Sequence, residues 1–190
     1  MTATITKRVL SDGTQEWRLP DGLLHREDGP ALITPDVADA WYKHGKLHRD
    51  FGPAVVCADG SQEWWSNGQL HRIGGPAVIR PGGTQEWYRH GKLHRDFGPA
   101  AIYEGRTRVW YQHGRLHRTD GPARTHADGS QAWFFAGERH REGGPAVIHP
   151  GDSEEWWLHG QLHRLDGPAV TRSDGTKEWW INGQPTSPRR

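Results

Sequence analysis

This 190-residue chain has a single cysteine, no long apolar run and almost no excess of either charge. The single cysteine, Cys57, excludes an internal disulfide framework, so packing and sheet hydrogen bonds must hold the fold. No stretch reaches the roughly 18 apolar residues of a membrane-spanning helix, and residues 1–9 lack the apolar core of a signal peptide. We therefore expect a soluble, cytoplasmic protein without a transmembrane segment.

The balance of charge limits the partners that the chain attracts. Its 24 Lys and Arg residues are interleaved with 23 Asp and Glu residues, which gives a formal net charge of +1. Such a chain has no bulk attraction for a phosphate backbone or an anionic lipid surface. We expect neither nucleic acid nor membrane as a partner, although local stripes of one charge remain possible.

What the sequence does contain is repetition. The pair His-Arg recurs every 23 residues and opens the phrase His-Arg-x-x-Gly-Pro-Ala. The copies begin at His25, His48, His71, His94, His117, His140 and His163. A fixed period of this length is typical of stacked repeat proteins, in which each unit contacts only its neighbours. The sequence predicts one such array.

An aromatic pair and two turn signals share the period. The first aromatic is Trp41, Trp64, Trp87, Trp110, Trp133, Trp156 and Trp179. A turn glycine follows, often after Asn or His as in Asn67-Gly68, and dipeptides such as Asp59-Gly60 mark a second turn half a repeat away. This second signal is degraded at Val37 and Arg106. Both kinds of dipeptide suit turns that need positive φ.

Short runs of β-forming residues lie between the turns, and no helical periodicity is present. Each unit is interpreted as a β-hairpin followed by a short extended stretch that Gly-Pro ends. Before that proline, a glycine such as Gly98 is expected to need a backbone geometry that a side chain would strain. We predict an all-β fold: an elongated array of about seven 23-residue hairpin units, forming an open sheet or solenoid.

The predicted organisation has three parts. Residues 1–24 form an irregular N-terminal capping half-repeat, since Trp17 breaks the register of the aromatic column. Residues 25–183 form the tandem repeats. Residues 184–190 form a C-terminal tail, in which Pro185, Pro188 and the final arginines protect the sheet edge from pairing with another chain.

The segment Glu63-Trp64-Trp65-Ser66-Asn67-Gly68, followed by His71, Gly75 and Gly82-Gly83, resembles the MORN repeat. That repeat is a 23-residue β-hairpin unit with an aromatic-x-x-Gly turn, and the resemblance covers residues 13–183. Here Leu-His-Arg-x-x-Gly-Pro-Ala replaces the usual Gly-x-x-x-Gly-x-Gly, so the chain looks like a variant. The resemblance implies an open repetitive sheet that serves protein interaction or, in some members, lipid contact. Bacterial relatives are often labelled antitoxins, which implies an antitoxin- or immunity-like role.

The histidine column suggests metal binding at first, but its geometry opposes this. Successive copies should lie about 10 Å apart if each repeat adds two strands, whereas nitrogen ligands lie about 2.1 Å from a shared zinc ion. Local pairs such as His90 with His94 are closer, but only four of the seven repeats keep the second histidine. We expect no metal site and no cofactor.

The arginine column has two interpretations. A guanidinium group suits carboxylate or phosphate, so Arg49, Arg72, Arg95 and Arg118 could form a ladder of binding groups. Alternatively, the His-Arg pair is a structural bracket, with the arginine paired to a nearby acid and the histidine bonded to backbone. Arg72 has no acid in the next two positions and is the least neutralised copy.

The second aromatic of each pair has the same two interpretations. Neighbours on a strand point to opposite faces, so one aromatic of each pair needs a cover from adjacent repeats or from a ligand. The candidate binding aromatics are Tyr42, Trp65, Tyr88, Tyr111 and Trp157.

Recognisable enzyme motifs are absent from the sequence, and its polar residues are repeated in parallel instead of converging as unlike groups. We predict a non-enzymatic scaffold that binds a macromolecular partner, a protein in the first instance, along its aromatic and arginine-bearing face. The alternative is a sequestering protein that holds small anions, such as nucleotides, at equivalent sites between repeats. Stoichiometry separates the two hypotheses. The sequence leaves the partner's identity and the oligomeric state open.

Overall fold

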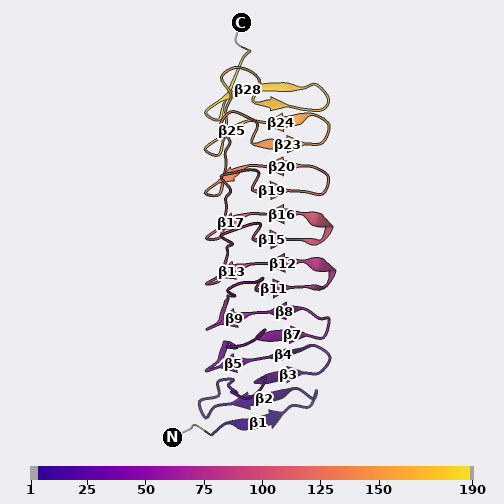
Figure 1. Ribbon diagram of the computed structural model, residues 1–190, viewed down its shortest axis with the longest axis vertical. Coiled ribbons are helices and arrows are strands. Elements are labelled where there is room, and N and C mark those ends of the chain that lie inside the picture. Colours follow the sequence, from indigo (N-terminus) through magenta and orange to yellow (C-terminus); the bar gives the residue numbers. More distant parts are fainter. Residues whose placement is uncertain (1–3, 189–190) are drawn as a thin grey trace. The chain divides into compact units, whose positions relative to one another are not determined.

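Short strands and tight turns make up residues 4–188, which the computed structural model describes and which contain no α-helix (Figure 1). The predicted all-β class and the succession of hairpins are confirmed. The chain divides into two compact units, residues 1–92 (unit 1) and residues 93–190 (unit 2). Within residues 4–188, no helix has the length and apolar character needed to cross a bilayer.

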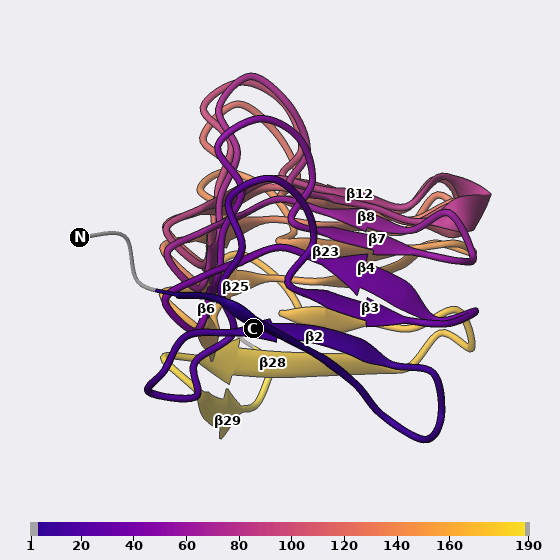
Figure 2. The ribbon, with the colours of Figure 1, turned by 90° about the horizontal axis from the view of Figure 1, so that it is seen from below.

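The main sheet of unit 1 is antiparallel, and its strands pair in chain order. The strands are β1 (Thr6–Val9), β2 (Gln15–Arg18), β3 (Leu32–Thr34), β4 (Ala38–Ala40), β7 (Val55–Cys57), β8 (Gln62–Glu63), β11 (Val78–Ile79) and β12 (Gln85–Glu86). A 3-10 turn, η1 (Pro81–Gly83), joins the last two. In Figure 2 the strands β2, β3, β4, β7 and β8 fan out progressively, as expected of a twisted sheet.

Unit 2 repeats the pattern. Its main strands are β15 (Ala101–Ile102), β16 (Arg108–Val109), β19 (Arg124–Thr125), β20 (Gln131–Ala132), β23 (Val147–His149), β24 (Ser153–Glu155), β27 (Val170–Thr171), β28 (Lys177–Ile181) and β29 (Gln184–Thr186). The turn η2 (Glu104–Arg106) joins β15 to β16.

Each repeat also contains a second, smaller hairpin, which the sequence had indicated only as an extended stretch. These hairpins are β5 (Tyr42–Lys43) with β6 (Lys46–Leu47), β9 (Trp65–Ser66) with β10 (Gln69–Leu70), β13 (Tyr88–Arg89) with β14 (Lys92–Leu93), β17 (Tyr111–Gln112) with β18 (Arg115–Leu116), β21 (Phe134–Phe135) with β22 (Glu138–Arg139), and β25 (Trp157–Leu158) with β26 (Gln161–Leu162). Their turns use two residues with positive φ, for example Asn67 at 50° and Gly68 at 79°. This confirms the predicted Asn-Gly turn.

The degraded turns place a non-glycine residue at positive φ, although Gly105, with φ 78°, precedes Arg106 in the second of them. Asp36 has φ 55° beside Val37, and Arg106 itself has φ 68°. Both turns therefore bear a conformation that costs a non-glycine residue free energy.

Alanine supplies the most deeply buried column. The alanine of each Gly-Pro-Ala is fully buried, at Ala31, Ala54, Ala77, Ala100, Ala123, Ala146 and Ala169. Its carbonyl accepts the backbone N–H of the first tryptophan of the same repeat, as Ala77 does from Trp64 at 2.8 Å. The small side chain lets loop and strand approach closely, so packing in these repeats rests on backbone proximity more than on large apolar groups.

The predicted boundaries at residues 24 and 183 stay predictions. Residues 6–9 pair with residues 15–18, and Gln184–Thr186 pairs with β28. Arg189 and Arg190, to which edge protection was assigned, lie outside the described residues.

Candidate functional site

The His-Arg loops place the arginine of a repeat over the first tryptophan of the same repeat. Six guanidinium groups lie 3.8–4.1 Å from a ring centroid, within the range of cation–π attraction. The pairs are Arg26 with Trp17, Arg49 with Trp41, Arg72 with Trp64, Arg118 with Trp110, Arg141 with Trp133, and Arg164 with Trp156. These arginines and Arg95 also donate through Nη1 to the carbonyl of the proline four residues later, at 2.9–3.3 Å. Each loop is thus closed by its own arginine.

The guanidinium group lies against the glycine before that proline, so a larger residue there would displace it. A Cβ built on Gly75 would lie 3.0 Å from Cζ of Arg72, closer than real Cβ contacts allow without a shift. Gly98 has φ 93°, a backbone geometry that a side chain would strain, as predicted; among the seven glycines before proline, only Gly52 and Gly98 have positive φ.

Each histidine of the column links its repeat to the next. Its Nδ1 accepts a hydrogen bond, 3.1–3.2 Å long, from the backbone N–H of the residue 19 positions later. The donors are His44, Asn67, His90, His113, Ala136, His159 and Asn182, which open the small-hairpin turns with φ between 47° and 51°. The imidazole must keep Nδ1 unprotonated to accept this bond.

Contact between the two imidazole rings accounts for histidine at that turn position, where Asn would be the usual residue; the His25–His44 pair is stacked and the others are tilted. His71 and His90 have ring centroids 4.6 Å apart, and equivalent pairs lie at 4.4–4.5 Å. Desolvation by burial lowers the pKa of His71, and the nearby charges of His90 and Arg89 lower it further. Within residues 4–188, no three His, Cys, Asp or Glu side chains are grouped so that they could hold a metal ion.

The four arginines predicted as binding residues are half-buried in these loops. Arg118 adds an ion pair from Nε to Asp120 at 2.8 Å. In the loops of Arg49 and Arg95 the acid bonds to histidine instead, since His48 Nε2 lies 3.0 Å from Asp50, as His94 does from Asp96. That contact lowers the pKa of the Asp50 carboxyl.

Arg72 has no acid in its loop, and burial lowers the pKa of its guanidinium group. Arg49, Arg72 and Arg118 contact a tryptophan ring and a proline carbonyl, and Arg95 contacts a proline carbonyl, so these partners outnumber acids, as the bracket interpretation requires.

Three of the five predicted binding aromatics contact the glutamate two residues before them. Trp65 Nε1 donates to Glu63 at 3.0 Å, Trp157 Nε1 donates to Glu155 at 2.8 Å, and the Tyr88 hydroxyl lies 3.3 Å from Glu86. Tyr42 and Tyr111 have no such glutamate, because Ala40 and Val109 occupy its position. All five aromatics are half-buried, and four pair across the small hairpin with a leucine: Tyr42 with Leu47, Trp65 with Leu70, Tyr111 with Leu116, and Trp157 with Leu162.

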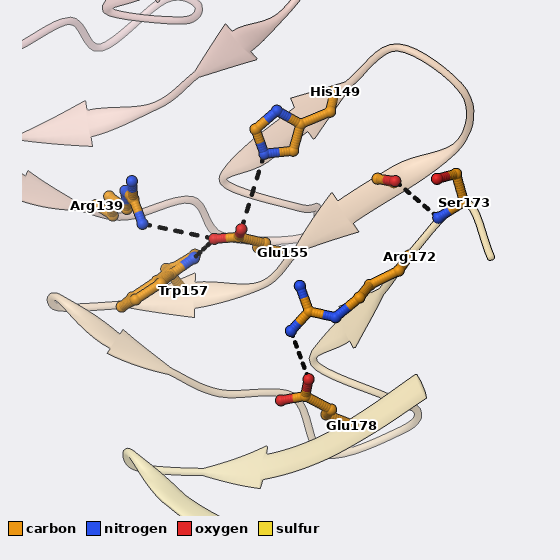
Figure 3. Close-up of polar contacts among 8 residues, drawn as sticks. Arg139, His149, Glu155, Trp157, Arg172, Ser173 and Glu178 are labelled. Carbon is orange, nitrogen blue, oxygen red and sulfur yellow. Dashed lines mark hydrogen bonds and ion pairs between the residues drawn. The ribbon is translucent and has the colours of Figure 1, made fainter. Parts of the chain in front are cut away.

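Figure 3 shows the most crowded of these glutamates. Glu155 accepts the indole N–H of Trp157 and also contacts Arg139 at 3.5 Å and His149 at 3.7 Å. Arg172 pairs with Glu178 in the next hairpin, which lowers the pKa of that carboxyl together with the Trp180 indole. The acids and bases of this cluster thus pair with one another.

The two variable positions of the His-Arg loop, named here the loop tip, carry side chains that sequence reasoning missed. In unit 1, Phe51 is 90% exposed and Ile73 is 83% exposed. In unit 2, Phe97 is 88% exposed and Leu165 is also exposed. The available sequence signal was an apolar residue between Asp and Gly in a loop. A side chain buried in the core by another segment would give the same signal, so the exposure of this side chain could not be predicted.

Grooves lie beside two of these loop tips. In unit 1, Arg49, Trp41 and Phe51 line a groove of about 430 Å³, together with Glu27, Asp28 and Asp50. In unit 2, Arg95, Arg118 and Tyr111 line another of about 430 Å³, together with Trp110, Asp96 and Phe97. Both combine an aromatic floor, guanidinium edges, acids and one exposed phenylalanine. The same set of groups is therefore present in each unit.

Searches for similar proteins found no match, either among protein-family models or among curated proteins. The resemblance to MORN repeats therefore stays a proposal, supported by the period and by the turn residues. Any functional assignment depends on the contacts described above.

Proposed function

We propose that this chain is a non-enzymatic β-repeat scaffold that binds a protein partner along the His-Arg loops. The observation that carries the proposal is the exposure of Phe51 and Phe97 at equivalent loop tips. Large apolar side chains that are nearly free of neighbours favour a partner that buries them, and aromatic residues are common among the dominant contacts of interfaces.

The two phenylalanines share a defined loop. Each follows an aspartate that bonds to histidine and precedes a glycine of positive φ, with φ 104° at Gly52 and 93° at Gly98. The arginine behind each is fixed by its proline carbonyl. A side chain presented by a fixed loop loses little conformational entropy on binding, which favours a protein–protein contact.

The groove residues fit a protein partner better than a small anion. Arg49, Arg95 and Arg118 could contact an acid at their outer edges, but Asp50, Asp96 and Asp120 line the same grooves. Trp41, Trp110 and Tyr111 supply aromatic surface. Mixed charge around an apolar centre is typical of protein interfaces. We place the protein in the cytoplasm because its only cysteine has no disulfide partner.

Under the MORN resemblance, the proposed binding takes the form of an antitoxin- or immunity-like role. The decisive experiment compares the natural chain with a variant carrying Phe51→Ser, Ile73→Ser and Phe97→Ser. Each is used as bait in an extract of the source organism, and captured proteins are quantified by mass spectrometry. A control with Val9→Ser and Val37→Ser removes exposed apolar residues outside these loops.

We expect a stoichiometric partner that the natural chain and the control retain and the loop-tip variant loses. Equal capture by all three baits would refute the proposed face. Calorimetric titration with ATP tests the sequestering alternative, because several equivalent binding events per chain would favour it over the scaffold.

A further inference from the structure

Unit 2 has a row of cross-strand neighbours in which valine and glutamate alternate over the last four strands, and this alternation breaks at Ala132, Arg124 and Val109. Cross-strand pairing joins Ala101, Val109, Arg124, Ala132, Val147, Glu155, Val170 and Glu178 into one row. Glu155 and Glu178 stand two residues before an aromatic, and Val109 and Ala132 occupy the same place in the two preceding repeats. Arg124 lies directly between these two apolar residues, where valine stands in the later repeats.

The neighbouring repeats show what an arginine meets on this sheet. Arg139 contacts Glu155, and Arg172 contacts Glu178 (Figure 3). In unit 1, Arg80 pairs with Glu63 at 3.1 Å. The usual partner is thus a glutamate carboxylate of the same chain. Val109 and Ala132 cannot supply one.

Three arginines near the break have no such partner. Arg106 and Arg108 are exposed and Arg124 is half-buried, and their side chains form no hydrogen bond or ion pair with any of residues 4–188. Arg108 pairs in register with Thr125, and the Thr107 hydroxyl lies 3.4 Å from the His126 ring. The two hairpin tips therefore lie side by side. Arg106, Arg108 and Arg124 are named here the arginine tip.

The acids close to the arginine tip are already engaged. Asp128 accepts the backbone N–H of Ser130 at 2.8 Å, a contact that lowers the pKa of its carboxyl, and Glu104 has its own interaction partner. Arg108 and Arg124 leave opposite faces of the sheet, because paired residues share a face and strand neighbours alternate. Arg108 and Arg124 therefore place their positive charges on opposite faces of this strand pair.

We propose that the arginine tip binds an acidic polypeptide segment, which supplies the carboxylates that Val109 and Ala132 lack. A guanidinium group takes a carboxylate through two parallel hydrogen bonds, the geometry best suited to a glutamate or aspartate side chain. A long phosphate backbone fits less well, since Glu104, Asp120 and Asp128 stand in the same repeats. This surface involves none of the loop-tip residues.

The probe is a fluorescein-labelled peptide with six successive glutamates, titrated with the full chain at about 50 mM salt, where screening is modest. Fluorescence polarisation should report saturable binding. Changing Arg106, Arg108 and Arg124 to Gln should weaken it by about tenfold or more, as expected when several charge contacts are lost together. The charge-matched control carries Arg8→Gln, Lys43→Gln and Lys46→Gln and should bind as the natural chain does.

A second variant, Ala132→Glu, restores the missing carboxylate directly opposite Arg124 while keeping every arginine. We expect it to lose most of the peptide affinity and to melt no lower than the natural chain. Undiminished affinity in this variant would overturn the placement of the site, as would an equal loss in the charge-matched control. Stronger binding of an oligo-dT strand than of the peptide would overturn the choice of an acidic polypeptide. The variant Phe51→Ser should bind the peptide normally, so this test and that of the proposed function fail independently.

Discussion

Two apolar residues of one His-Arg loop have opposite environments. Ala77, at the base of the loop, is fully buried, whereas Ile73, at its tip four residues earlier, is 83% exposed. The base alanine recurs in each of the seven copies and the tip residue does not. In this chain the repeated columns supply contacts within and between repeats, and the residues that vary at the loop tips are exposed. Chemistry that differs between repeats is found at these tips and, in unit 2, in the strand row that contains Arg124.

Enlarging the buried alanine at the base of the His-Arg loop should have the largest effect on the free energy of unfolding. Ala77→Leu adds three carbons where loop and strand touch, and we expect a loss of about 3 kcal/mol in the free energy of unfolding, typical of severe overpacking. Ile73→Ala at the tip should change it by about 0.5 kcal/mol or less. Urea unfolding of both variants gives the comparison. Equal midpoints would show that the loop base tolerates expansion.

Substituting an arginine that closes its loop should lower stability more than substituting an exposed arginine. Arg72→Gln removes the stack on Trp64 and leaves the Pro76 carbonyl without its donor, so we expect a loss of about 2 kcal/mol. Arg108→Gln removes an exposed side chain without partners and should cost about 0.5 kcal/mol at most. A sharply lowered melting temperature for Arg72→Gln would identify its column as a structural bracket. An unaltered melting temperature would favour the binding ladder.

Substituting one turn residue should raise the stability of the fold modestly. Ala136 has φ 51° at a position that holds His or Asn in the other repeats, and alanine is disfavoured there. Ala136→Asn should raise stability by about 1 kcal/mol, because asparagine tolerates this conformation. Asn67→Ala makes the reverse change in unit 1 and should lower stability similarly. Thermal melting of the two variants checks the pair, and two shifts of the same sign would contradict the argument.

The pH dependence due to His71 should be the smallest effect. Its folded pKa lies below the ordinary histidine value, so the unfolded chain binds the proton more readily. The stability linked to His71 is full above the unfolded pKa and is lost as pH falls through the folded pKa. We expect His71→Gln to flatten the fall in urea midpoint between about pH 7 and pH 5. A slope identical to that of the natural chain would show that His71 does not contribute to the pH dependence of stability.

The sequence was sufficient to predict the hairpins and their turns. Asn67-Gly68 and Asp59-Gly60 place positive φ where the structure has it, since local backbone sterics decide such turns. Acid partners for the arginine column were anticipated and occur at Arg26, Arg118 and Arg164. In the loops of Asp50 and Asp96 the acid lies one residue earlier and reaches histidine instead.

The ring and carbonyl partners of the arginine column could not be predicted from spacing. Trp64 and Arg72 are eight residues apart, and the small hairpin between them determines that ring and guanidinium meet. The proline carbonyl that Arg72 bonds is invisible in a pattern of side chains. The exposure of Phe51 likewise depends on the loop geometry and not on the residue type.

The contacts between consecutive repeats have constant sequence separations. The histidine bond from His140 spans 19 residues to His159, and the bond from the Arg141 N–H spans 16 residues to the Trp157 carbonyl. Excising any 23 consecutive residues inside the array, such as 140–162, therefore rejoins equivalent positions and recreates both bonds with the following copy. Gene-level loss or duplication of whole periods would alter only which loop tips follow one another. Whole repeats can therefore change their order while the hydrogen bonds between consecutive repeats stay the same.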